Sequence, residues 1–302
     1  MRSAAAWAPA WSSLAALHLT LHVSFGASGR THGPGQERSL VDFPDGGRRE
    51  PRTAALRGTL DTMRSAPNNL TRLHQQEEAI RTWSLDAVSK NGSLSDHLQA
   101  LHDALDHLTL LLHVESKPGD RLHTVQLLAM RLFNCGGSSL KLGLSGYYQA
   151  AFQLLRDSLE LVNLVDLFRI DADAIDRWKD ADDKTLKKEF APVHVRRRLE
   201  AHPDFAGQRR ELVYSTFSGY AAHPSYKGFM LIAPGNRPRL GPFFDGGLLL
   251  ALLGDLSKHI AHAALGVSLL LETRDIGVLR GKAEYLKKLR GYHDQYLKQG
   301  TP

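Results

Sequence analysis

Leucine recurs along residues 93–113 at intervals of three and four, and this spacing constrains the fold more than any other feature of the chain. The stripe consists of Leu94, Leu98, Leu101, Leu105, Leu108 and Leu112. Side chains spaced in this way fall on one face of an α-helix, because the helix turns once every 3.6 residues or so. The segment is therefore predicted to be an amphipathic helix that buries this face, with Ser93 or Ser95 as its N-cap.

The same periodicity covers most of the remaining sequence. Helices are predicted at 120–134, 145–170, 172–180, 183–189, 193–201, 207–222, 246–272 and 276–297. Gly136 and Gly137 are expected to end the helix at 120–134, since glycine weakens a helix. Residues 229–245 differ, because a Pro-Gly-Asn turn separates two short apolar runs. The predicted fold class is therefore all-α: a helical bundle with a small β-hairpin or ordered-loop insertion near 229–245.

The chain divides into residues 1–62 and residues 63–302. The first part contains no Asp or Glu before Glu37 and becomes rich in Gly, Arg and Pro. Three explanations stay open for it: a disordered leader, a signal or transit segment, or a leader that precedes a true start at Met63. Residues 63–302 carry the regular periodicity and are predicted to form a single helical-bundle domain.

Composition excludes several classes of protein. The single cysteine, Cys135, rules out an intrachain disulfide and a cysteine-only metal cluster, and it suits the reducing cytoplasm. The 15 histidines form no metal-binding motif, and the nucleotide-binding and hydrolase motifs are absent, so neither metal nor cofactor is predicted. The apolar segment 246–272 is long enough to cross a membrane, but it carries Asp255 and Lys258. A buried helix is therefore predicted instead of a membrane span.

The helix at 145–170 carries a narrow polar face. Its members, spaced four, three, four and three residues apart, are Gln149, Gln153, Arg156, Glu160 and Asn163. One interpretation is a solvated face with an Arg156–Glu160 ion pair, which stabilises a helix by only about 0.3–0.5 kcal/mol. The other is a polar site between helices, because Phe152 and Leu159 border the stripe. The sequence leaves both interpretations open.

Four pieces of the chain resemble a bacterial family of uncharacterised helical proteins. They are GYYQAAFQLLRDSLELVNLVDLF, Trp178, FAPVHVRRRL and YSTFSGYAAHPS, and the resemblance covers about residues 94–275. That family typically shows a Gly-Tyr-Tyr-Ala start, an Arg-Ser-x-x-Glu helix and a Tyr-x-x-Leu-Ser-x-x-x-His-Pro element. This chain departs from the pattern at Asp157 and Phe217.

Such proteins are distantly similar to the HEPN superfamily, whose members include metal-independent ribonucleases and toxin or antiviral components. The resemblance implies functional roles for Arg156, Glu160, Tyr214, Ser218 and His223 in this chain. It implies a HEPN-like helical module that acts by protein or nucleic-acid interaction, in a defence or stress context. These expectations come from the resemblance and not from chemistry visible in the residues.

The alternative hypothesis is a metal-independent ribonuclease or another small enzyme. In it Arg156 holds an anion, Glu160 orients a donor and His223 transfers protons. HEPN ribonucleases place an Arg four to six residues before a His. In this chain only His202 has arginines at that distance, Arg196 and Arg197 among them, and chance alone supplies such pairs.

The partners expected for an interaction module follow from the basic residues. The chain has a net charge of +6, and its residues predicted to bind a partner are Asn163, Tyr214, Ser218, Arg196 and Arg197. Further basic and aromatic groups are Arg209, Arg210, Arg237, Arg239, Tyr220, Phe243 and Phe244. They fit either RNA or an acidic protein, or a simply solvated set of charges. The long apolar C-terminal helices also allow a homodimer.

Overall fold

The computed structural model describes residues 68–205, 209–234 and 237–297, and within these ranges it is made of helices and loops without a β-strand. The prediction of an all-α bundle is confirmed. The predicted leader, residues 1–62, lies outside the described ranges.

Most of the helices lie within a few residues of their predicted bounds. They are α2 (Asn68–Lys90), α3 (Gly92–Leu111), α4 (Arg121–Leu144), α5 (Tyr148–Ile170), α6 (Ala174–Lys179), α7 (Asp183–Glu189), α8 (Pro192–Glu200), α9 (Arg210–Phe217), α10 (Gly246–Leu270) and α11 (Ile276–Tyr296). Shorter turns are η3 (Pro203–Phe205), the π-helical η4 (Ser218–Ala222) and η5 (Tyr226–Leu231).

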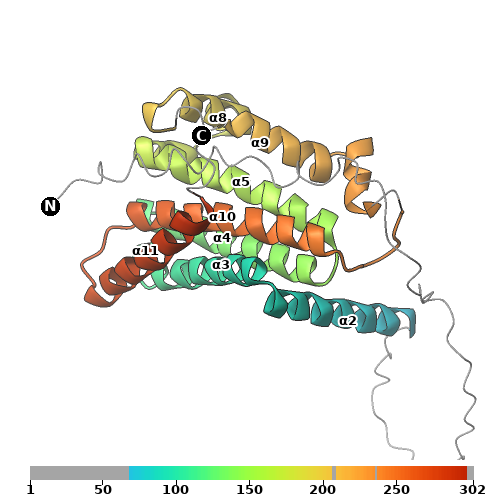
Figure 1. The fold of residues 1–302 in the computed structure, drawn as a ribbon. Helices are drawn as coiled ribbons and strands as arrows, with labels where there is room; N and C mark the ends of the chain where they lie inside the picture. Colours follow the sequence, from blue (N-terminus) through green and yellow to red (C-terminus); the bar gives the residue numbers. More distant parts are fainter. Residues whose placement is uncertain (1–67, 206–208, 235–236, 298–302) are drawn as a thin grey trace, which may run out of the picture.

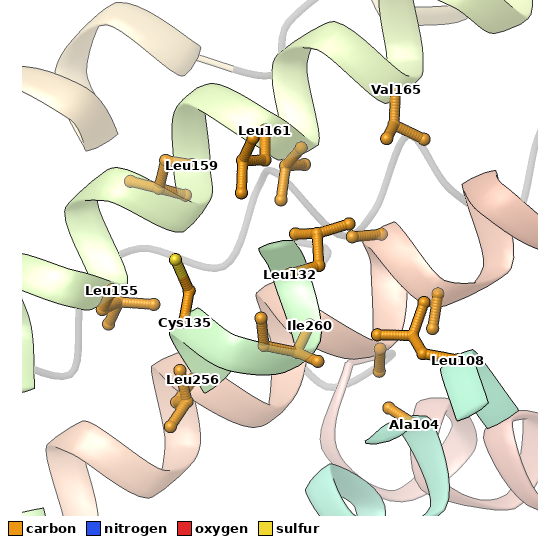
Figure 2. Close-up of a cluster of buried hydrophobic side chains, with 14 of the residues drawn as sticks. Ala104, Leu108, Leu132, Cys135, Leu155, Leu159, Leu161, Val165, Leu256 and Ile260 are labelled. Atoms are coloured by element: carbon orange, nitrogen blue, oxygen red, sulfur yellow. The ribbon is translucent and has the colours of Figure 1, made fainter. Parts of the chain in front are cut away.

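Helix α10 is the centre of the bundle. It packs against α3, α4 and α5, while α11 crosses α3 and the α8–α9 layer lies on the outer side of α5 (Figure 1). Leu252, Leu253, Leu256 and Ile260 are fully buried. Figure 2 shows Leu256 and Ile260 among Leu132, Cys135, Leu155 and other apolar side chains of α4 and α5. Burial on several sides explains why α10 is apolar around most of its circumference.

Helix α10 is also long and apolar enough to cross a membrane by length and composition. However, 83% of its most apolar window is buried inside the bundle. The prediction of a buried core helix at 246–272 is therefore confirmed.

Helix α4 runs straight through the two glycines that were predicted to end it, so that prediction is wrong. A Cβ on Gly136 would lie 3.2 Å from Leu105 Cδ2 and 3.4 Å from Ile260 Cγ1. The missing side chain therefore lets α4 approach α3 and α10 closely, and this packing outweighs the low helix propensity of glycine.

The N-cap predicted for α3 is also wrong. Asn91, and not Ser93 or Ser95, accepts the capping bond, from the N–H of Leu94 to Oδ1 at 3.1 Å. The helix begins at Gly92, which places both serines inside its first turns.

The described residues 232–234 and 237–245 take the loop form of the two that were predicted near 229–245, and Tyr226–Leu231 form the 3-10 helix η5. Ser225 Oγ accepts a bond from the N–H of Gly228 at 3.1 Å and so begins η5. The N–H of Arg239 donates to the carbonyl of Ile232 at 2.8 Å, and this bond ties the two sides of the loop together. The described part of the loop contains no strand.

Candidate functional site

The polar face of α5 meets α8, α9 and η4 in a cluster that we call the polar clamp, made of Arg156, Glu160, Arg196, Tyr214 and Ser218. Arg156 forms an ion pair with Glu160 at 2.8 Å and donates hydrogen bonds to the Tyr214 hydroxyl and, at 3.4 Å, to Ser218 Oγ. The Tyr214 hydroxyl in turn donates to Glu160 Oε1 at 2.9 Å. Arg156, Glu160 and Tyr214 therefore form a closed triangle of mutual contacts.

Arg196 closes the clamp from α8. Its guanidinium lies over the Tyr214 ring, 3.8 Å from the centroid, and two of its nitrogens donate to Glu211 Oε2 at 2.7 and 2.9 Å. The Arg196 side chain is only 4% exposed. A cation held over an aromatic face and paired with a carboxylate is already neutralised. Arg196 therefore fixes α8 to α9.

A second polar cluster lies along α5, centred on the fully buried carboxylate of Asp166. His262 Nε2 lies 2.9 Å from both carboxylate oxygens, and Arg210 and Arg169 bond to them at 2.7 and 3.0 Å. Arg210 also donates to Asn163 Oδ1 at 2.6 Å. This cluster, which we call the buried carboxylate centre, joins α5, α9 and α10.

Electrostatics accounts for the stability of this buried charge. Burial alone would raise the pKa of Asp166, but the neighbours His262, Arg210 and Arg169 outweigh that effect and hold the pKa below its ordinary value. Asp166 is therefore ionised, and it binds three elements of the bundle to one another.

The structure brings most of the predicted site residues together. Arg156, Glu160, Arg196, Tyr214 and Ser218 are the clamp itself. Asn163 is 6% exposed and belongs to the buried carboxylate centre through Arg210. Arg197 and His223 are exposed.

His223 ends the helical turn that carries the clamp residue Ser218. Its backbone is extended (φ −102°, ψ 141°), and its N–H donates to the Ser218 carbonyl at 3.0 Å. Pro224 explains this end, because the residue before a proline avoids helical geometry. The described residues give the His223 side chain no hydrogen bond to Arg156 or Glu160.

The two interpretations of the polar face on α5 each describe a part of it. Gln153 is exposed, Arg156 and Glu160 are about one-quarter exposed beneath α9, and Asn163 is buried. The face therefore passes from solvent into the interior along the helix.

Sequence reasoning missed the buried carboxylate centre, although one signal for it was present. Asp166 follows Asn163 by three residues and so continues the polar face. Its partners Arg210 and His262 are distant in sequence, and only the tertiary fold brings them to it.

Histidines in the described ranges form no group of three or more metal-ligating residues. His107 stacks on Tyr285 with ring centroids 4.1 Å apart, and burial lowers its pKa to about 4. His97 Nδ1 lies 2.8 Å from the Tyr292 hydroxyl, and burial lowers its pKa to about 4 as well. Both rings are therefore neutral packing groups near pH 7.

The segment that leads from η4 to α10 differs from the clamp, because several of its basic and apolar side chains are exposed to solvent. We call it the aromatic–basic loop, and its residues are Tyr226, Lys227, Phe229, Arg239, Leu240 and Phe244. Tyr226 is 86% exposed, Phe229 51% and Leu240 fully exposed. Within the described residues, Lys227 and Arg239 make no side-chain ion pair. No Asp or Glu occurs between Glu211 and Asp245, so the loop has no acidic residue of its own.

The bundle holds this loop in place. Gln76 of α2 donates to the carbonyl of Pro242 at 3.1 Å, and the N–H of Phe243 donates to that of Gly146. Phe243 packs on Tyr148, with ring centroids 5.5 Å apart, and Leu231 is 2% exposed. The loop is therefore anchored by buried groups and presents others to solvent.

Compared with family models, with curated proteins and with solved structures, the chain gives no significant match in any of the three. The HEPN resemblance stays a prediction.

Proposed function

We propose that the protein is a HEPN-like helical module of the cytoplasm that binds an acidic partner, single-stranded RNA, through the aromatic–basic loop. The observation that carries the proposal is the exposure of Tyr226, Phe229 and Leu240 beside Lys227 and Arg239, in a segment without a carboxylate. The role in defence or stress belongs to the same proposal and derives from the resemblance.

The loop supplies both kinds of contact that single-stranded RNA requires. Aromatic rings stack on bases, which contributes about 1–3 kcal/mol per base and tolerates any sequence. Tyr226 and Phe229 are adjacent, with ring centroids 6.3 Å apart, so they offer two such surfaces. Lys227 and Arg239 pair with phosphates and release counterions from the RNA.

The polar clamp supports a structural role within the same proposal. Each of its charges already has a partner in the chain, so binding a phosphate there would first have to break an ion pair. Arg156 therefore holds α9 against α5, and Arg196 holds α8 against α9, next to the helical turn from which the loop emerges.

A titration of fluorescently labelled oligouridine with the full chain tests the proposal. We expect the anisotropy to report binding that weakens steeply as salt rises, because the loop releases counterions. Replacing Arg239→Glu should weaken binding by about ten-fold, since it turns one attraction into a repulsion. The matched control is Arg280→Glu, because Arg280 is exposed on α11, which packs on α3 and α10 at the other end of the bundle from the segment after α9 (Figure 1).

Three outcomes of the titration would contradict the proposal. Equal losses in the two variants would place the effect in net charge and not in the loop. Absence of binding to oligouridine at low salt would reject RNA as the partner. Binding to a polyglutamate peptide, without binding to RNA, would identify an acidic protein instead.

The alternative proposal is a metal-independent ribonuclease that uses Arg156, Glu160 and His223. The contact between Arg156 and Glu160 supports it, and the exposure of His223 counts against it. Incubating the full chain with RNA, beside a His223→Ala variant, distinguishes the two proposals. Cleavage that disappears only in the variant would establish the enzyme, and equal background cleavage would reject it.

A further inference from the structure

Helix α4 has one face that the rest of the described chain leaves uncovered. Leu127 is 51% exposed, Met130 41% and Phe133 39%. Their spacing of three places them along one side of the helix, and Asn134 follows with its side chain exposed. Three large apolar groups in a row on one solvent-facing helix make up an apolar surface of the kind that marks an interface.

The second half of the same face is made of small or slender residues. Asn134, Ser138 and Lys141 are exposed, and Gly137 is partly exposed. A Cβ on Gly137 would meet nothing within 4 Å, so no contact inside the described chain requires a glycine there. A glycine inside a helix costs about 0.5–1 kcal/mol relative to alanine. Close approach of another molecule to the backbone gives that glycine a role.

Charge allows two such faces to meet. Helix α4 contains no Asp or Glu, and Arg131, the cation in the middle of it, is paired with Asp157 of α5 at 3.2 Å. The apolar half of the face therefore carries no uncompensated charge that a second copy would have to bury. Lys141, at the outer end of the small half, is exposed, and its long side chain keeps the amine in water while the stem packs against an apolar neighbour.

We propose that α4 pairs with α4 of a second copy of this chain, antiparallel and about a two-fold axis that passes near Asn134. In this register the large half of each helix lies against the small half of the other. Met130 of one copy packs opposite Ser138 of the other, and Arg131 opposite Gly137. The two Asn134 amides face one another on the axis and can exchange hydrogen bonds.

This interface is independent of the aromatic–basic loop, and it differs from the dimer predicted from the C-terminal helices. Helix α10 uses its apolar surface inside the core, whereas the bulky-to-small order along α4 is self-complementary. Ridges of large side chains that enter gaps left by small ones are the usual geometry of a close helix pair.

The mass of the full chain in solution, measured by light scattering over a range of concentrations, tests the proposal. We expect a dimer that Gly137→Leu weakens by about ten-fold or more, because a branched side chain would enter the space that the second helix occupies. The matched control is Gly291→Leu. Gly291 lies inside α11, is exposed and has equally open space around its Cβ position.

Cysteine crosslinking tests the register. Asn134→Cys should form an intermolecular disulfide on mild oxidation, because the axis brings the two residues together. Ser138→Cys should not, since each residue 138 lies one turn from the axis and the pair is about 12 Å apart. The native Cys135 does not compete, because it is buried and burial raises its pKa to about 11.

A monomeric mass for the unsubstituted chain at every concentration would overturn the proposal. So would a dimer that Gly137→Leu and Gly291→Leu affect equally. Crosslinking of Ser138→Cys in preference to Asn134→Cys would reject this register and, with it, the two-fold axis proposed here.

Discussion

The polar clamp and the buried carboxylate centre, which together we call the polar layer, contain both arginine and tyrosine, and so does the aromatic–basic loop. In the polar layer these side chains are paired within the chain, whereas in the loop they face solvent. In the layer, Arg156, Arg196 and Arg210 are each matched by a carboxylate of the same chain. In the loop, Lys227 and Arg239 have no carboxylate within the segment, and Tyr226 is 86% exposed.

The difference separates charges that hold the fold from charges that are available to a partner. A buried ion that loses its partner is costly, so the layer must keep its pairs intact. Exposed cations lose nothing in water by having no partner, so the loop can carry them without a cost to folding. Substitutions in the layer should therefore change stability, and substitutions in the loop should change binding.

The largest effect is expected at the buried carboxylate centre. Asp166→Ala should lower the free energy of unfolding by about 3–5 kcal/mol, because it leaves Arg210 and His262 buried without their carboxylate. Urea denaturation followed by circular dichroism measures the change. The control is Asp106→Ala, since Asp106 is exposed on α3 and should change stability by less than about 0.5 kcal/mol. A loss for Asp166→Ala no larger than that of the control would contradict the ionic role of this centre.

A second buried carboxylate, Asp255 of α10, should respond to pH in the opposite direction from Asp166. Burial raises the pKa of Asp255 from 3.8 to about 6, against the attraction of Lys258, whose Nζ lies 4.0 Å away. Folding favours the protonated form of Asp255. The contribution of this group to the free energy of unfolding is therefore fully present below pH 3.8 and is lost as pH rises through about 6. Asp166 has a lowered pKa, so its contribution is present above pH 3.8 and is lost as pH falls below it.

The substitution Asp255→Asn tests how much stability the folded protein loses when Asp255 ionises. The pKa shift corresponds to about 3 kcal/mol, so the variant should gain up to that amount over the unsubstituted chain between pH 4 and 7. Denaturation curves of both proteins at several pH values give the difference. A difference that stays constant with pH would show that folding does not raise the pKa of Asp255.

A smaller loss is expected at the centre of the clamp. Tyr214→Phe removes the hydroxyl that donates to Glu160 and accepts from Arg156, but it keeps the ring beneath Arg196. The free energy of unfolding should fall by about 1 kcal/mol, the usual value for a side-chain hydrogen bond. Tyr226→Phe is the matched control, because Tyr226 is 86% exposed. Equal stability of the two variants would show that the clamp hydroxyl contributes nothing.

The smallest change in stability is expected in the loop. Arg239→Glu should alter the free energy of unfolding by less than about 0.5 kcal/mol, because the exposed guanidinium makes no ion pair with the described residues. Thermal unfolding measures this. A larger loss would show that Arg239 stabilises the fold, which would contradict the expectation that substitutions in the loop leave stability unchanged.

The helices that could be predicted from the sequence are those whose buried face carries regularly spaced apolar residues. Helix α3 follows from its leucines because they line one face and are mostly buried. Helix α2 was not predicted, since its buried line of Ile80, Ser84 and Val88 is narrow and interrupted by a serine. The passage of α4 through Gly136 depends on contacts with Leu105 and Ile260, which lie far away in sequence.

The polar clamp could be predicted in part, because two of its residues are neighbours on one helix. Arg156 and Glu160 share a helix, so their spacing places them together before any tertiary structure is known. Arg210, Asp166 and His262 come from three helices, and no local pattern could pair them. His223 was linked to Arg156 only through a resemblance, and its exposed position at the end of a helical turn follows from Pro224.

The most direct test of the account compares RNA affinity in two variants of the full chain. We predict that Tyr226→Ala combined with Phe229→Ala weakens binding to oligouridine by about ten-fold or more, because two stacking surfaces are lost. Tyr214→Phe, in the clamp, should bind like the unsubstituted protein. The opposite result, with affinity lost in Tyr214→Phe and kept in the loop variant, would place the binding site in the clamp and contradict the account.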